Sequence, residues 1–127
     1  MKGNIINLLW IPLLLLISAG CAGQENLEKD SFPIVTALGK SVAHATSDGV
    51  DLREFTVLSA GEYANGRTSV IRRDSTVDFE TAILRKLQNK RYWEVCYGPV
   101  EPEMVGATYC YYLDRSSYEL IADYKVK

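Results

Sequence analysis

Three cysteines and one histidine are the side chains of this 127-residue sequence best suited to covalent or acid–base chemistry. A nucleophilic Cys–His pair would need Cys96 or Cys110 beside His44, with an acid to orient the imidazole. His44 falls late in a segment with helical spacing, where a histidine more often interacts with a helix C-terminus. A single histidine also excludes a multi-histidine metal site. We therefore expect no catalytic residue, no metal and no cofactor at these positions.

Two acidic clusters could supply paired carboxylates for general acid–base catalysis. Neither cluster has a basic or apolar setting that would shift a carboxyl pKa strongly, and neither has the ligand spacing of a calcium loop. We expect both clusters to be solvated and the protein not to be an enzyme. The clusters are Asp48, Asp51 and Glu54, then Glu101 and Glu103.

Cys21 differs from the other two cysteines because it ends an export-signal pattern. Lys2 precedes an uncharged apolar run over residues 8–17, and small residues at 18–20 lead into the cysteine. The run is shorter than a membrane-spanning helix needs, and this order is typical of a signal peptide. The pattern resembles a bacterial lipobox, which implies that Cys21 carries a palmitate-type acyl anchor. An ordinary secretory signal and a retained N-terminal anchor are the alternatives.

This pattern divides the chain into three parts. We expect residues 1–20 to be a lipoprotein signal peptide, residues 21–30 to be the lipidated cysteine with a polar tether, and residues 31–127 to be one domain. Ala22 follows the cysteine where an Asp would favour retention, which resembles the default outer-membrane signal of Gram-negative lipoproteins. We therefore expect an outer-membrane lipoprotein that faces the periplasm and meets the membrane through its lipid anchor.

The charge balance excludes one large class of partner. Without Lys2 the mature chain has 14 − 1 = 13 basic residues against 16 acidic ones, a net charge near −3. Adjacent basic residues occur only at 72–73, 85–86 and 90–91, whereas a nucleic-acid-binding protein needs a concentrated basic surface. We therefore expect no nucleic-acid partner.

The elements that position these residues follow from hydrophobic periodicity. Apolar residues recur at helical spacing over residues 33–46 and 77–89, so we expect two helices. Residues 52–63 alternate as a strand does, and Asn65-Gly66 is a strong hairpin signal, so residues 68–72 are the expected returning strand. Three further β-rich runs follow, at residues 92–97, 107–113 and 118–125.

Cys96 and Cys110 supply a register for the last three strands. An even pair in an exported chain is most simply a disulfide, with two separate buried thiols as the alternative. If the two face each other, antiparallel partners sum to 206, and the apolar odd-numbered positions all fall on the opposite face. A turn at residues 114–117 then places Leu113 opposite Tyr118 and extends that face into the last strand. We therefore expect a half-buried sheet with helical cover on one face.

The same strands resemble a known group of domains. Tyr92 to Pro99 (YWEVCYGP), Gly106 to Asp114 (GATYCYYLD) and Glu119-Leu120-Ile121 resemble the end of small bacterial domains with the cystatin-like or nuclear-transport-factor-like fold. That group includes toxin-immunity proteins and peptidase-propeptide (PepSY-like) domains. We therefore expect an α+β domain in which an antiparallel sheet of about four to five strands packs against one or two helices, in a cystatin-like roll with a Cys96–Cys110 cross-strand disulfide.

Binding of a protein partner fits this pattern better than catalysis. The expected protein is an inhibitor or immunity protein against an exported enzyme or toxin, and its acidic loop would favour a basic partner. The predicted contact residues are two tyrosines and a glutamate on the cysteine face with two loop acids: Tyr92, Glu94, Tyr112, Glu101 and Glu103. The alternative is a small-ligand-binding periplasmic domain whose pocket, between sheet and helices, is lined by Trp93, Tyr97, Tyr109 and Tyr111.

Overall fold

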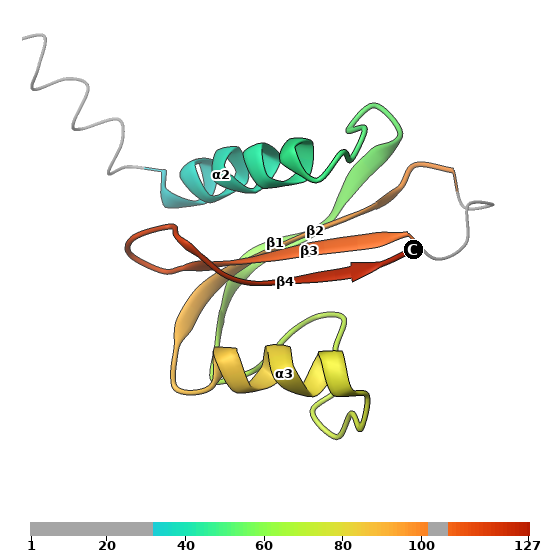
Figure 1. Cartoon of the computed structure of the whole chain (residues 1–127). Coiled ribbons are helices and arrows are strands. Elements are labelled where there is room, and N and C mark those ends of the chain that lie inside the picture. Colours follow the sequence, from blue (N-terminus) through green and yellow to red (C-terminus); the bar gives the residue numbers. More distant parts are fainter. Residues whose placement is uncertain (1–31, 102–106) are drawn as a thin grey trace, which may run out of the picture. The chain divides into compact units, whose positions relative to one another are not determined.

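Two helices and four strands make up the part of the chain that the structure, a computed structural model, describes: residues 32–101 and 107–127 (Figure 1). The sheet order is β1-β2-β3-β4, and each strand is antiparallel to its neighbour. The fold is α+β with an open antiparallel sheet, as the sequence predicts. In chain order the elements are α2 (Pro33–Ser47), β1 (Phe55–Ala64), α3 (Asp78–Leu87), β2 (Arg91–Pro99), β3 (Thr108–Asp114) and β4 (Leu120–Val126). The predicted signal peptide, Cys21 and the tether at residues 21–30 lie outside the described residues.

Each helix has the local signals that its sequence predicts. Pro33 is the first residue of α2, where its missing N–H costs nothing. After the last turn Gly49 has a φ of 80°, a conformation that favours glycine, and the N–H of Val50 donates to the carbonyl of Ala45. Helix α3 has two acids in its first turn and two basic residues in its last, which complements its dipole.

The two helices lie on opposite faces of the sheet (Figure 1). One face carries Trp93, Val95, Tyr97, Tyr111 and Leu113, which pack with residues of α2 and the segment after it. The other face carries Tyr92, Cys96, Cys110, Tyr112 and Ala122, which pack with residues of α3. The expected cover on one face only is therefore wrong, because the cysteine face is a second core.

The predicted register of β2 and β3 is confirmed. All paired positions from Tyr92↔Asp114 to Tyr97↔Tyr109 sum to 206. Cys96 and Cys110 lie opposite each other, are fully buried and form a disulfide.

The predicted register of β4 is wrong. Leu113 pairs with Leu120 instead of Tyr118, and a register shift after Tyr112 moves the remaining partners by one more residue. The connection is longer than a four-residue turn because the Asp114 carboxylate accepts the N–H groups of Ser116 and Ser117. Tyr118 then adopts a φ of 59° and packs against the α2 face before the strand begins. Sequence alternation alone carries no signal for this extra residue pair.

The predicted returning strand at residues 68–72 is also wrong. Asn65 and Gly66 do form a tight turn with positive φ values of 55° and 73°. However, β1 pairs with β2 and not with the segment that follows the turn. Residues 67–77 instead form a loop between β1 and α3 that carries three arginines.

Candidate partner-binding surface

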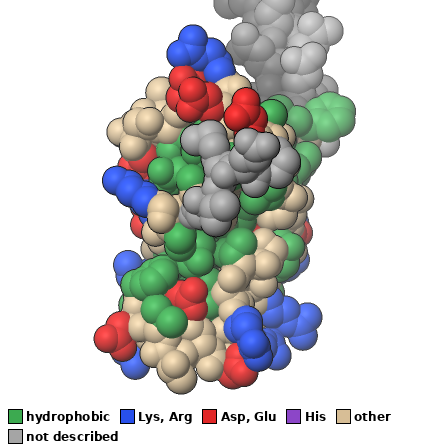
Figure 2. All heavy atoms as spheres, turned by 90° about the vertical axis from the view of Figure 1, so that its right-hand side faces the viewer, with side chains coloured by type: hydrophobic (Ala, Val, Ile, Leu, Met, Phe, Trp, Pro, Cys, Tyr) green, Lys and Arg blue, Asp and Glu red, His purple; other side chains and the backbone are tan. Residues whose placement is uncertain are grey.

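Three apolar side chains are exposed where β1 begins and β2 ends. Val57, Leu58 and Val100 expose 46%, 57% and 57% of their surface, and we call them the β1-edge patch. Leu58 covers Gly98 so closely that a Cβ there would lie 2.5 Å from Leu58 Cδ1. Figure 2 views this end of the molecule and shows hydrophobic side chains in a band down its middle, with charged side chains mostly toward its borders. Single exposed apolar residues are ordinary, but a group of them on one edge indicates an interaction surface.

A β-bulge in β1 creates this arrangement. Val57 is opposite Tyr97 and Ser59 is opposite Cys96, so Leu58 is an extra residue with no partner of its own. Residues two apart normally share a face of a sheet, but the bulge places Val57 on the α2 side and Ser59 on the α3 side. Leu58 lies over Gly98, which is on the same face of β2 as Cys96, so the α2 side of the edge presents Val57 and the α3 side presents Leu58.

The charges beside the β1-edge patch are acidic. Glu54 and Glu101 are exposed, and the backbone N–H of Val100 donates to the carbonyl of Glu54 at 2.9 Å. The nearby Arg53 is held by Asp51 at 2.9 Å. Within residues 32–101 and 107–127, neither Glu54 nor Glu101 belongs to an ion pair. Glu101 is thus exposed as predicted, and Glu103 lies outside the described residues.

Three of the predicted contact residues are not on the surface. Tyr92, Glu94 and Tyr112 have 0% exposure because α3 and the loop before it cover the cysteine face. A side chain without accessible surface offers nothing to a partner, so their assignment to an exposed contact face is corrected. They belong to the second core.

Glu94 anchors the loop that covers it. Both of its carboxylate oxygens accept the backbone N–H of Ser69, at 3.2 and 3.0 Å, and Oε1 also accepts the Ser59 hydroxyl at 3.3 Å. Tyr92 donates its hydroxyl to the carbonyl of Arg67 at 2.7 Å. Burial raises the pKa of Tyr92 to about 12, so the hydroxyl keeps its proton for that bond. Buried polar groups are tolerated when they are bonded in this way.

The aromatic residues assigned to the alternative ligand pocket fill the space between α2 and the sheet. Tyr97 and Tyr111 are 3% and 0% exposed, and their rings pack edge to face with centroids 6.2 Å apart. A hydrogen bond of 2.6 Å joins the Tyr97 hydroxyl to Ser41 of α2. Tyr109 packs edge to face against Phe55. These contacts make the four-residue set a packed core.

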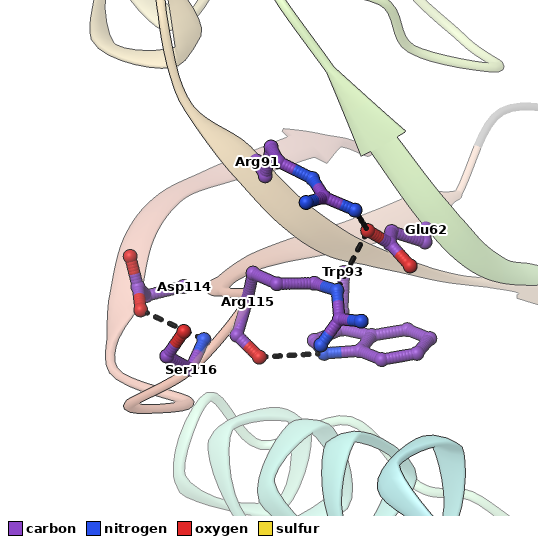
Figure 3. A network of polar contacts seen from close by, with 6 residues as sticks. All are labelled: Glu62, Arg91, Trp93, Asp114, Arg115 and Ser116. Atoms are coloured by element: carbon purple, nitrogen blue, oxygen red, sulfur yellow. Dashed lines mark hydrogen bonds and ion pairs between the residues drawn. The ribbon is translucent and has the colours of Figure 1, made fainter.

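Trp93 is fixed by a network at the other end of the same face (Figure 3). Its Nε1 donates to the carbonyl of Arg115 at 3.2 Å, and the Arg115 guanidinium lies 5.4 Å from the centre of its ring. Arg91 and Arg115 both contact the same oxygen of Glu62 at 2.6 Å. The Arg115 hydrogen bond is the main cause that lowers the pKa of Glu62. This network satisfies the indole and fixes the β3–β4 connection.

His44 and Asp48 belong to a cluster of side chains that holds the end of α2 against the sheet. The half-buried His44 ring stacks on Tyr111, and the Tyr111 hydroxyl donates to Asp48 at 2.8 Å. Lys125 contacts the same Asp48 oxygen at 2.9 Å, and its hydrogen bond is the main cause that lowers the pKa of that carboxyl. Arg53 likewise lowers the pKa of Asp51. An ionised, paired carboxylate is a poor general acid at neutral pH.

The described residues contain neither a cluster of metal-ligating side chains nor a helix that could span a membrane. No group of three or more His, Cys, Asp and Glu side chains in residues 32–101 and 107–127 is placed to hold a metal ion. In the same part of the chain, no helix combines the length and apolar character needed to cross a membrane.

Sequence reasoning missed the β1-edge patch. The available signal was the run from Thr56 to Gly61, which has no charged residue. The bulge that exposes Val57 and Leu58 on two sides has no comparable signal. Comparison of the chain with protein-family models, with curated proteins and with solved structures gave no match.

Proposed function

We propose that this chain is a non-catalytic cell-envelope lipoprotein that binds a protein partner through the β1-edge patch. The observation that carries the proposal is the group of three large apolar side chains, two on the edge strand β1 and one directly after β2, each at least 46% exposed. An inhibitor or immunity protein against an exported enzyme or toxin is the kind of protein that works this way, by occupying a surface and not by chemistry.

The contrast between the two edge strands supports this assignment. On the β4 edge Asp123 and Lys125 form an ion pair at 3.0 Å, and charged residues of this kind protect an edge from pairing with other chains. The β1 edge has no charge between Thr56 and Gly61. Within the described residues, β1 has a single neighbouring strand. An uncharged edge with free backbone groups suits the addition of a strand from a partner.

Charge indicates the chemistry of that partner. Glu54 and Glu101 border the β1-edge patch, and Glu103 follows two residues later in the sequence. Glu54 and Glu101 beside an apolar surface favour a partner with lysine or arginine next to apolar side chains. Like-charged partners would be rejected by the same acids.

The proposed location and ancestry rest on the sequence patterns. Acylation of Cys21 would hold the domain at the outer membrane, facing the periplasm, with residues 22–30 as the tether. The likeness of the last three strands to cystatin-like, toxin-immunity and PepSY-like domains is consistent with a small binding domain, and we propose that relation on the strand motifs alone.

The decisive experiment combines cross-linking with matched substitutions. A photo-cross-linking residue at position 58, in the full chain in cells, is expected to capture one partner, which then allows binding to be measured with purified proteins. Leu58→Lys should weaken that binding at least tenfold, because it places a charge in the apolar contact. Leu120→Lys is the matched control, since Leu120 is a 39% exposed leucine on the other edge strand.

Three results would contradict the proposal. They are unchanged binding of the Leu58→Lys variant, an equal loss in the Leu120→Lys control, and unchanged binding when both Glu101 and Glu103 are replaced by lysine. Fatty-acid labelling that persists in a Cys21→Ala variant would contradict the proposed anchor.

A further inference from the structure

The loop between β1 and α3 forms an open pocket that is rich in arginine. Residues 67–74 and Tyr63 line a hollow of about 630 Å³, and three of these residues are exposed arginines: Arg67, Arg72 and Arg73. A second hollow of about 670 Å³ shares Tyr63 and Arg67 and includes Arg91. The loop runs back beside β1, where the Ser69 hydroxyl lies 3.1 Å from the Ser59 hydroxyl, but none of the residues that line either hollow belongs to the β1-edge patch.

Buried groups hold the backbone of this loop in place. Glu94 accepts the N–H of Ser69, and Tyr92 donates to the carbonyl of Arg67. Ile71 is 4% exposed, and its N–H donates to the Thr68 hydroxyl at 2.7 Å. A loop that is anchored at residues 67, 69 and 71 has little backbone entropy left to lose when a ligand binds. Such preorganisation strengthens binding.

The positive charge of the pocket is only partly neutralised. Asp74, the one acid in the lining, is engaged by Arg72 at 3.1 Å. Glu62, the acid of the neighbouring hollow, is already shared by Arg91 and Arg115 (Figure 3). In the described part of the chain, Arg67 and Arg73 form no ion pair. Two arginines outside any ion pair therefore line one hollow of a protein whose net charge is −2.

The side chains that line the pocket favour an anionic ligand. Each guanidinium has a planar fork of N–H donors that matches a phosphate group in bidentate fashion. A net charge of two positive units suits a dianion better than a single carboxylate. Tyr63 adds an amphipathic ring to the wall.

We propose that this pocket binds a phosphate-bearing small molecule or lipid headgroup, with Arg67 and Arg73 as the residues that contact the phosphate. The site shares no residue with the β1-edge patch and is tested with different substitutions, so it does not rest on the proposed partner binding. The proposal also assigns a role to the buried Glu94, because its carboxylate fixes the loop that carries both arginines.

The test measures phosphate binding to the full chain, purified in a neutral maltoside detergent. Inorganic pyrophosphate, titrated calorimetrically at constant ionic strength, represents a soluble ligand, and acetate is the monoanion control. Flotation with phosphatidylglycerol vesicles, compared with phosphatidylcholine vesicles, represents a headgroup. We expect saturable binding in at least one arm, and at least a tenfold loss in the Arg67→Gln/Arg73→Gln double variant. Which arm responds identifies the source of the phosphate.

Arg85→Gln is the matched control, because Arg85 is an exposed arginine of α3 outside both hollows. It should bind as the wild type does. The substitutions are on exposed side chains, so a circular dichroism melt should show unchanged folding in all variants. The proposal is overturned if neither probe binds, if acetate binds as well as pyrophosphate, or if Arg85→Gln loses as much binding as the double variant.

Discussion

The two faces of the sheet are built on different physical principles. The α2 face is a core of aromatic and aliphatic side chains with one buried hydrogen bond, between Tyr97 and Ser41, and it contains no buried carboxylate and no disulfide. The α3 face combines apolar packing with a disulfide and the fully buried Glu94. The first face is stabilised mainly by area removed from water. The second depends on a covalent link and on polar groups that must be satisfied.

Because of this difference, only the α3 face uses buried polar groups to fix the loop of the proposed phosphate site. The polar groups of the α3 face do not approach solvent themselves, but they fix the loop that carries Arg67 and Arg73. The aromatic groups of the α2 face hold helix α2 and, through the Trp93 indole, the β3–β4 connection, but they do not hold the loop that carries the proposed site. A core that anchors an exposed loop through buried acceptors can keep a binding site rigid without exposing its own residues.

The disulfide should give the largest effect on the α3 face. Cys96 and Cys110 are 14 residues apart, and closing a loop of that size stabilises by about 3 kcal/mol in the chain-entropy model. We expect the double alanine variant to lose about that free energy of unfolding in urea titrations. Cys21→Ala should leave it within about 0.5 kcal/mol. A loss below about 1 kcal/mol in the double variant would show that the apolar contacts alone define this face.

Glu94 should give the next largest effect. Glu94→Gln keeps the shape but turns charge-assisted acceptors into a neutral amide, so we expect a loss of about 2 kcal/mol. The amide hydrogen of Ser69 should also exchange faster, because it donates to both carboxylate oxygens. The exposed Glu101→Gln variant is the control and should change stability by less than about 0.5 kcal/mol. Equal effects at the two positions would remove the anchoring role of Glu94.

The sequence predicts the α2 face well and the α3 face poorly for one reason. Alternation places apolar residues such as Trp93 and Tyr111 on one side, and that signal is independent of what covers the other side. Glu94 and Tyr92 are indistinguishable in sequence from exposed strand residues, so their face was predicted to be solvated. Only the cysteine pair carried a signal for it, and that pair did predict the register.

The β1-edge patch was likewise predictable only in those features that depend on the local sequence. An uncharged edge strand and an exposed Glu101 were within reach of sequence analysis. The bulge at Leu58 and the loop that replaces the expected strand at residues 68–72 depend on tertiary contacts. In particular, Ser69 gives its N–H to Glu94 instead of to a neighbouring strand, and this acceptor is 25 residues away in the sequence.

Two adjacent tyrosines of β3 allow the faces to be compared by the same substitution. The Tyr111 hydroxyl donates to Asp48 on the α2 side, so Tyr111→Phe should lose about 1 to 2 kcal/mol. The Tyr112 hydroxyl on the α3 side is buried close to Glu94 and, among the described residues, makes no hydrogen bond of good geometry. Tyr112→Phe should therefore be neutral or stabilising in the same urea titration. Equal losses would show that both hydroxyl groups are satisfied.

The smallest effect belongs to the border of the α2 face and depends on pH. Lys125 lowers the pKa of Asp48, so the folded protein binds fewer protons there than the unfolded chain does. The stabilisation is therefore present above the unfolded-state value of about 3.9 and is lost as the pH falls through the lower folded-state pKa. Because Lys125 is 37% exposed, solvent limits the effect to less than about 1 kcal/mol.

A Lys125→Met variant removes this contribution together with the contact between Lys125 and Asp123. In urea titrations at pH 7 it should be slightly less stable than the wild type, and the difference should shrink as the pH approaches 2. High salt should reduce the difference at pH 7, because the pair is partly exposed. The buried Glu94→Gln effect should depend much less on salt, since screening ions do not reach it. An equal salt response of the Lys125→Met and Glu94→Gln variants would mean that water and ions reach Glu94. The polar groups of the α3 face would then be part of the surface.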